Sequence, residues 1–134
     1  MRTIKFRGKD VNTREWLYGD FVKCNGETFI SNYNEVGQLT YTKDDIHINK
    51  VIPETVCQLA IQYKEYDIYE HDLVSLRGLL GEVVFDSKRG CFCVLYISTQ
   101  KLSIFSLGEE LILTDIELEG NIFDNKQLLY EKVY

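Results

Sequence analysis

The sequence predicts an all-β protein with one or two short helices, and three observations carry that prediction. Apolar and polar residues alternate with period two along most of the chain, beginning with Ile4-Lys5-Phe6-Arg7, as expected for half-buried strands. Turn-forming residues recur about every eight to twelve residues, the spacing of an antiparallel sandwich or barrel. No long apolar pattern of helical period is present, so helices are not expected to dominate the fold.

The first half of the chain is expected to form an antiparallel meander. Its strands are predicted over residues 3–7, 15–24 and 27–33. Asn25-Gly26 separates the last two strands, and both residues tolerate the positive φ angles of a type I′ turn. Residues 34–54 are polar and turn-rich, although Ile46-His47-Ile48 alternates. Pro53 then introduces a predicted strand over residues 55–62, which either bulges or bridges the two halves.

The second half is expected to form a small antiparallel barrel. Strands are predicted over residues 72–76, 82–85, 91–97, 102–105 and 116–122. Gly120 is expected to break the last of these strands. A capping-box pattern over residues 106–109 predicts one short helix. Asp124 or Asn125 can cap a second helix over residues 126–130, packing its leucines onto the barrel.

The boundary between the halves is expected near residues 62–68, where no linker composition interrupts the chain. We therefore predict two packed lobes: residues 1–64 as an N-terminal antiparallel β lobe, and residues 65–134 as a C-terminal barrel lobe with a short terminal helix. Asp72-Leu73-Val74, followed by Gly78 and Gly81-Glu82-Val83, resembles the strand–loop–strand opening of SH3-like barrels. Such barrels host many functions, so this likeness indicates a fold and not an activity.

Composition and charge exclude some classes of protein. The 134 residues are 45% hydrophobic, which is enough to bury a core, and no apolar run is long enough to span a membrane. The first ten residues carry no apolar signal segment, so a cytoplasmic location is expected. The net charge is -6, and no basic residue occurs between Lys101 and Lys126. An acidic chain repels phosphate, which argues against strong non-specific binding to nucleic acid.

The cysteines form no C-x-x-C pair, so we expect buried thiols rather than a disulfide framework or a metal site. They are Cys24, Cys57, Cys91 and Cys93. Cys91 and Cys93 are predicted to share one face of a strand. A metal site remains the alternative if folding brings another cysteine or a histidine next to them.

Acid–base catalysis is a weaker prediction than a structural turn. Asp67, Glu70, His71 and Asp72 place carboxylates beside a histidine, the pairing that general acid–base catalysis uses. Consecutive residues seldom converge on one point, and Asp and Glu are common where a turn enters a strand. No glycine-rich phosphate motif occurs. We therefore expect neither an enzyme nor a cofactor.

Binding to a protein partner, or self-assembly into a homo-oligomer, is the favoured prediction. The nine tyrosines and Trp16 suit a protein interface, and exposed strand edges invite pairing with another chain. The central motif is the hypothetical interaction surface. Its residues are Tyr66, Tyr69, Glu70, His71 and Asp72.

Nucleic acid is the alternative partner. Its predicted contacts are basic residues along the first strand, namely Arg2, Lys5, Arg7 and Lys9. The predicted stacking platforms are Trp16, Tyr18, Tyr41 and Tyr63. The acidic second half argues against this alternative, so a protein partner is preferred.

Three blocks of sequence carry a resemblance to a known family. They are Ile4-Lys5-Phe6-Arg7 with Trp16-Leu17-Tyr18-Gly19-Asp20; Pro53-Glu54-Thr55-Val56 with Gln58, Asp67-Ile68-Tyr69-Glu70 and Asp72-Leu73-Val74; and Ile116-Glu117 with Gly120-Asn121-Ile122, Asn125 and Leu128-Leu129. In these blocks the chain resembles the YopX family of phage and prophage proteins.

The resemblance implies a β-rich fold in two lobes, the second an SH3-like barrel, and a phage or prophage accessory protein of a bacterial host. It transfers no catalytic or ligand-binding residue. The family usually carries glycine where this chain has Cys57 and His71, so a positive φ at either position would strain the backbone. The motif residues Tyr69, Glu70, Asp72, Gly120 and Asn121 are expected to pack and to form turns.

Overall fold

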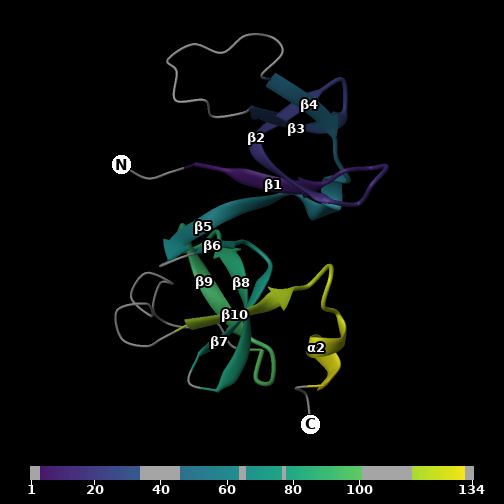
Figure 1. The fold of residues 1–134 in the computed structure, drawn as a ribbon. Helices are drawn as coiled ribbons and strands as arrows, with labels where there is room; N and C mark the ends of the chain where they lie inside the picture. Colours follow the sequence, from purple (N-terminus) through teal and green to yellow (C-terminus); the bar gives the residue numbers. More distant parts are fainter. Residues whose placement is uncertain (1–3, 34–45, 64–65, 77, 101–115, 132–134) are drawn as a thin grey trace. The chain divides into compact units, whose positions relative to one another are not determined.

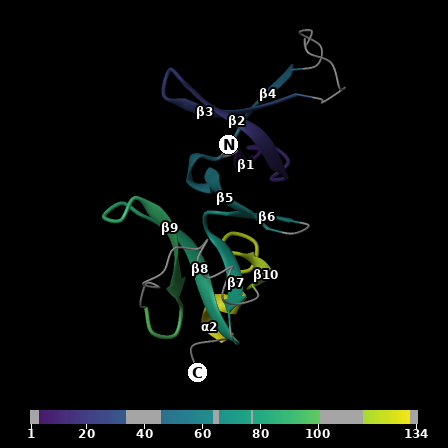
Figure 2. The ribbon, with the colours of Figure 1, turned by 90° about the vertical axis from the view of Figure 1, so that its left-hand side faces the viewer.

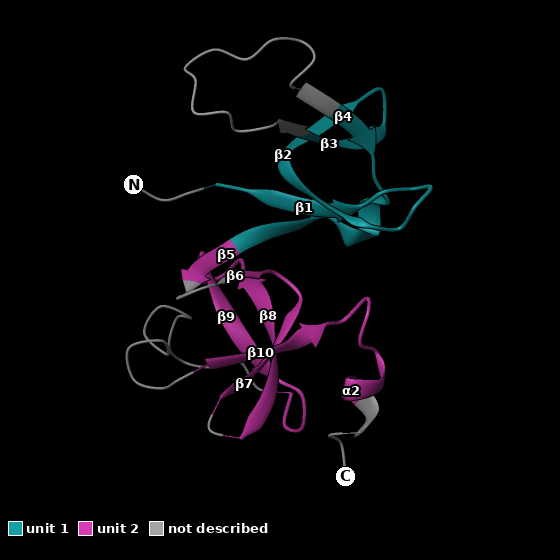
Figure 3. Ribbon diagram, in the orientation of Figure 1, with its two compact units in different colours: residues 1–59 teal, residues 60–134 magenta. Residues whose placement is uncertain are grey.

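The computed structural model of the 134-residue chain describes residues 4–33, 46–63, 66–76, 78–100 and 116–131 (Figure 1). These residues form antiparallel strands, one 3-10 turn and one short α-helix, which confirms the all-β prediction. The chain divides into two compact units, residues 1–59 and 60–134 (Figure 3). The division falls inside strand β5, earlier than the expected boundary after residue 64.

The strands of the first unit follow the predicted meander. They are β1 (Phe6–Lys9), β2 (Trp16–Cys24), β3 (Glu27–Tyr33), β4 (Ile46–Lys50) and the start of β5 (Cys57–Tyr63). Their hydrogen-bonded order is β4-β3-β2-β1-β5. Asn25 and Gly26 have φ angles of 52° and 79°, as the predicted hairpin between β2 and β3 requires. β4 lies in the segment that was expected to be turn-rich, and the alternation at residues 46–48 was its only signal.

Two turns of the first unit are held by short polar side chains. The Asp10 carboxylate accepts the backbone N–H groups of Asn12 at 2.8 Å and Thr13 at 3.0 Å. The hydrogen bonds from these two backbone groups hold the pKa of Asp10 below its ordinary value. In the 3-10 turn η2 (Pro53–Thr55), the Thr55 hydroxyl donates to the Ile52 carbonyl at 2.7 Å and accepts the Lys9 N–H at 2.9 Å. Thr55 thereby fastens η2 to the end of β1.

The second unit is built on a four-stranded sheet in the order β10-β7-β8-β9. Its elements are β6 (Tyr66–Tyr69), β7 (Asp72–Leu76), β8 (Leu79–Asp86), β9 (Cys91–Tyr96), β10 (Ile116–Asn121) and the helix α2 (Gln127–Glu131). The hairpin formed by β8 and β9 can be followed in Figure 2. The pairing of β10 with β7 shifts register between Leu118 and Gly120, the break predicted at Gly120. The strand and helix expected over residues 102–109 lie outside the described residues.

The core of the second unit covers both sides of this sheet. One cluster joins Ile68, Val74, Leu76, Val83, Phe92, Val94 and Ile116. A second cluster joins Leu73, Leu80 and Ile97, and Leu128 and Leu129 around the start of α2 pack against it. The predicted packing of these two leucines is confirmed. Successive side chains of a strand point to opposite faces, so a sheet buried on both faces needs the nearly continuous apolar run of β7.

Candidate functional site

Basic side chains of β1, and of Lys5 just before it, lie over aromatic rings of β2. The guanidinium carbon of Arg7 is 4.4 Å from the centre of the Trp16 ring, and Lys9 Nζ is 5.3 Å from it. Lys5 Nζ lies 5.6 Å from the centre of the Tyr18 ring. The strand register explains this arrangement, because Arg7 pairs with Tyr18 and Lys9 with Trp16 on one face of the sheet.

This ladder of cations and rings brings together several of the predicted nucleic-acid residues. Lys5, Arg7 and Lys9 share one face with Trp16 and Tyr18, whereas Arg2 and Tyr41 and the side chain of Tyr63 lie outside the described residues. Arg7 is only 6% exposed, so a ligand could reach its guanidinium only after a rearrangement, and its predicted contact with nucleic acid stays a prediction. The cations already lie over these rings, and cation–π contacts of this kind stabilise the sheet itself.

The same face continues across β3 and β4. Residues directly opposite in an antiparallel pair share a face, and Asp20 pairs with Ser31, which pairs with Ile48. By the same register Phe29 lies on the face of Trp16 and Tyr18. We call this surface the aromatic face, defined by Trp16, Tyr18, Phe29 and Ile48. Ile48 is 61% exposed and Tyr18 is 42% exposed.

The sequence predictions missed half of the aromatic face. Trp16 and Tyr18 were predicted as stacking platforms for nucleic acid and were also among the aromatic residues thought to suit a protein interface. Phe29 was not singled out within its predicted strand, and Ile48 was not predicted as a contact because β4 was expected to be a turn-rich segment. The alternation of Ile46-His47-Ile48 was the available signal.

The central motif forms the tight turn between β6 and β7. The buried Asp72 carboxylate accepts the Tyr69 N–H at 2.8 Å, which closes the turn with a side chain. Tyr69 and Asp72 are each 2% exposed. They are covered in this structure, so their place in the predicted interaction surface gains no support and stays a prediction. The side chain of Tyr66 is not among those that the structure describes.

His71 is the unusual residue of that turn. Its φ angle is 70°, a conformation that costs residues with a Cβ about 1–2 kcal/mol. Its ring Nδ1 lies 2.7 Å from Glu82 Oε2, and its Nε2 lies 3.9 Å from Glu70 Oε2. The ring also meets Phe123 edge-on, with centroids 6.0 Å apart. Cys57 and His71 are the two positions where glycine was expected. The predicted backbone strain is present at His71, but Cys57 adopts no positive φ.

The final block of the resemblance is also a turn. The Asn121 side-chain oxygen accepts the N–H groups of Phe123 and Asp124, both at 2.9 Å. Asn125 Oδ1 accepts the Asn121 N–H at 3.1 Å. Gly120 has a φ of 149°, and a Cβ there would collide with Asn125. The central and final blocks thus fasten backbone turns, which agrees with the expected structural roles of their residues.

The cysteines are all reduced thiols. Cys57 and Cys93 are buried and Cys24 is exposed. The Cys91 and Cys93 sulfurs are 3.8 Å apart. Burial, followed by the hydrogen bond with Cys91, raises the pKa of Cys93 from 9.0 to about 11. Among the described residues, no three His, Cys, Asp or Glu side chains converge as metal ligands.

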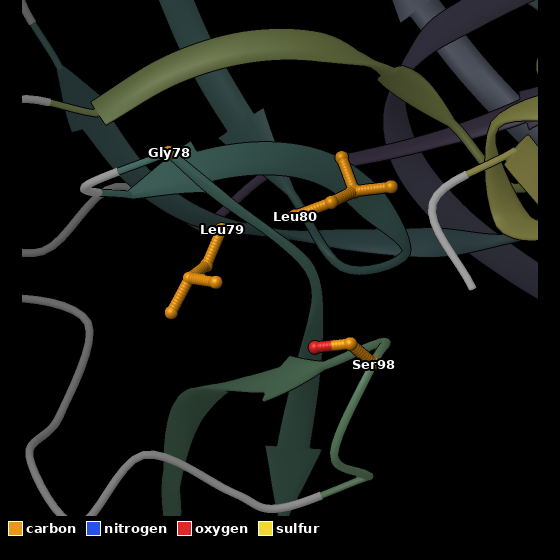
Figure 4. Close-up of a pocket in the computed structure, with 4 residues that line it drawn as sticks. All are labelled: Gly78, Leu79, Leu80 and Ser98. Atoms are coloured by element: carbon orange, nitrogen blue, oxygen red, sulfur yellow. The ribbon is translucent and has the colours of Figure 1, made fainter. Parts of the chain in front are cut away.

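A small pocket opens beside the turn between β7 and β8. Gly78, Leu79, Leu80 and Ser98 line its volume of about 160 Å³ (Figure 4). The Ser98 hydroxyl is the polar side-chain group among these lining residues, and none of the four is an acid, a base or a thiol. This lining does not provide the pairing of acid, base and nucleophile that catalysis requires.

None of the helices in the described part of the chain has the length and apolar character needed to cross a membrane. No protein-family model, curated protein or solved structure matches the chain. The resemblance to the YopX family therefore stays a prediction, and the function has to be argued from the geometry.

Proposed function

We propose that this protein is a non-catalytic module that binds another macromolecule through the aromatic face of residues 1–59, and that the partner is a protein. The observation that carries the proposal is the exposure of Tyr18 and Ile48 on one face of a sheet that also presents Trp16 and Phe29. Aromatic side chains such as tryptophan and tyrosine are among the groups that contribute most at protein interfaces.

The small core of the first unit supports this proposal. Among its described residues, the buried apolar side chains are Ile30, Val51, Cys57 and Leu59. Its exposed large apolar side chains are Ile4, Tyr18, Phe21 and Ile48. A unit that leaves as many large apolar side chains in water as it buries gains stability when a partner covers them.

Nucleic acid remains the second candidate, because Lys5 and Lys9 lie on the aromatic face. Two observations rank it below a protein. The cations lie over the rings that would stack on bases, and the net charge of the chain is -6.

From the resemblance to the YopX family, we further propose that the protein is a phage or prophage accessory protein that acts in the cytoplasm of a bacterial host. We also propose that the unit of residues 60–134 is an SH3-like barrel. The order β10-β7-β8-β9 of a twisted antiparallel sheet supports that assignment.

The test is an affinity capture with matched surface variants. The tagged full chain, its Ile48→Asp variant and its Leu79→Asp variant are incubated with bacterial lysate, with and without nuclease. Leu79 is the control because it is 50% exposed and lies in the other unit. We expect a protein that survives nuclease, is lost with Ile48→Asp and is retained with Leu79→Asp.

Other outcomes contradict the proposal or redirect it. Equal capture by both variants would show that the aromatic face is not the binding surface. Capture that nuclease abolishes, and that weakens steeply with salt, would favour the nucleic-acid candidate. Concentration-dependent sedimentation of the pure chain that Ile48→Asp suppresses would identify the partner as a second copy.

A further inference from the structure

The thiols of Cys91 and Cys93 face each other on β9. They are two residues apart in a strand, so their side chains leave the same face. Their sulfurs are 3.8 Å apart. Cys93 is buried, while Cys91 is half-buried and gives access from the surface. Within the described sheet β9 is a terminal strand, with β8 as its neighbour.

This spacing does not suit a disulfide between the two residues. A disulfide needs sulfurs about 2.05 Å apart and Cα atoms no more than about 6.8 Å apart. Residues i and i+2 of an extended strand have Cα atoms about 6.6–6.8 Å apart. The pair therefore lies at the limit of the allowed range, and closing it would bend β9.

The same spacing suits a metal ion held between the two sulfurs. Two thiolates that each lie about 2.3 Å from a tetrahedral ion are about 3.8 Å from each other. The sulfurs of Cys91 and Cys93 are already 3.8 Å apart. An ion can therefore bridge the sulfurs without a change in the backbone.

The surroundings of the pair favour a cation over a free thiolate. Asp86 is opposite Cys91 in the register with β8, so its carboxylate lies on the same face. Arg89 partly neutralises that carboxylate, with Nη1 at 3.1 Å from Asp86 Oδ2.

We propose that Cys91 and Cys93 form a two-thiolate site for a soft d10 metal ion of the Zn²⁺ and Cd²⁺ class. Binding forms two metal–sulfur bonds and releases two thiol protons to solvent, with no change of oxidation state. Among the described residues no third His, Cys, Asp or Glu side chain joins the pair, so the proposal rests on these two sulfur ligands alone.

The test uses Cd²⁺ as the probe and the reduced full chain. We expect one equivalent of Cd²⁺ to produce the ultraviolet thiolate-to-cadmium charge-transfer absorption and to release two protons per ion. Cys91→Ser should abolish the absorption, because it removes one of the two sulfurs. Cys24→Ser is the matched control, since it removes an exposed thiol in the other unit, and it should leave the absorption unchanged.

Three results would overturn the proposal: no absorption from the native chain at one equivalent, absorption retained in Cys91→Ser, or absorption lost in Cys24→Ser. Cys91 is half-buried and its replacement is nearly isosteric, so Cys91→Ser is expected to fold. Far-ultraviolet circular dichroism checks this. If Cys91→Ser fails to fold, alkylation of Cys91 with iodoacetamide in the Cys24→Ser variant replaces it, and absorption that survives this block counts against the site.

Discussion

Residues 60–134 and residues 1–59 use the same kind of antiparallel strand but bury their apolar side chains differently. In the second unit, side chains from both faces of the four-stranded sheet join apolar clusters, and residues such as Val74, Val83 and Val94 are fully buried. In the first unit, Ile30 and Val51 are fully buried while Ile48 and Tyr18 on the opposite face are exposed. The four-stranded sheet has an apolar cluster on each face, although Leu79, Phe85 and Leu118 stay exposed, whereas the sheet of the first unit presents an aromatic face to solvent.

This difference in burial separates folding stability from recognition of a partner. Burial of apolar surface contributes most of the favourable free energy of folding, so the second unit is the stable part of the chain. Exposed apolar and aromatic surface contributes to binding instead. The comparison therefore assigns stability mainly to residues 60–134 and recognition to residues 1–59.

Truncation of a buried side chain should cost more in the second unit than in the first. Leu76→Ala removes a side chain enclosed by the main cluster, where neighbours on several sides limit collapse. We expect a loss of about 3–5 kcal/mol in the free energy of unfolding. Ile30→Ala should cost about 2–3 kcal/mol, because a smaller core relaxes more easily. Urea unfolding measures both, and a larger loss for Ile30→Ala would contradict the comparison.

Gly81 tests the tight packing between β8 and β9. A Cβ at Gly81 would collide with the buried side chain of Val94. We expect Gly81→Ala to lower the free energy of unfolding by about 2–3 kcal/mol through overpacking. Gly26→Ala is the control, because its Cβ meets no atom within 4 Å and its cost of about 1 kcal/mol comes from positive φ alone. Equal costs for the two variants would show that the sheet adapts freely at Gly81.

His71 should show two opposing contributions. His71→Ala loses the contact with Glu82 and keeps the positive φ, so we expect a loss of about 1 kcal/mol in the free energy of unfolding. His71→Gly loses the same contact but relieves the backbone by about 1 kcal/mol, so it should be nearly neutral. Thermal unfolding compares the variants. If glycine is less stable than alanine, the positive φ is not a source of strain.

The pH dependence of Cys93 should be the smallest effect. The pKa of Cys93 is raised from 9.0 to about 11, so the folded state keeps a proton that the unfolded state loses in this range. The corresponding stabilisation is complete below pH 9 and is lost as the pH rises through about 11. At pH 8.5 we expect iodoacetamide to alkylate the exposed Cys24 well before Cys93. Mass spectrometry of the peptides measures the order, and equal rates would contradict the burial of Cys93.

Elements with local signals were predicted well from the sequence. Asn25-Gly26 specifies its hairpin because the turn needs two consecutive residues that tolerate positive φ. The strands on either side of it followed from their alternation. β4 was missed because it is short and polar, and it pairs with β3 across a long intervening segment. β6 was missed because a four-residue strand is too short to show a clear alternation, although its neighbour β5 is close in sequence.

The candidate site was less predictable than the fold. The alternation of side chains along a strand predicted that Lys5, Arg7 and Lys9 share one face. Only the register of β1 against β2 brings them over Trp16 and Tyr18. Burial of Arg7 likewise depends on neighbours that a single strand does not reveal. The central motif was expected to contain turn residues, and it was also proposed as an interaction surface. The sequence alone does not show which side chains of a turn are buried by the rest of the protein.

Native-state hydrogen exchange with mass spectrometry tests the contrast between the units most directly. Amides of β7 and β8 should exchange last, because the sheet that contains them has an apolar cluster on each face. Amides of β3 and β4 should exchange earlier, through openings that leave the second unit folded. That result would support stability in residues 60–134 and recognition in residues 1–59. Slower exchange in β3 and β4 than in β7 and β8, or one common rate for all four strands, would contradict it.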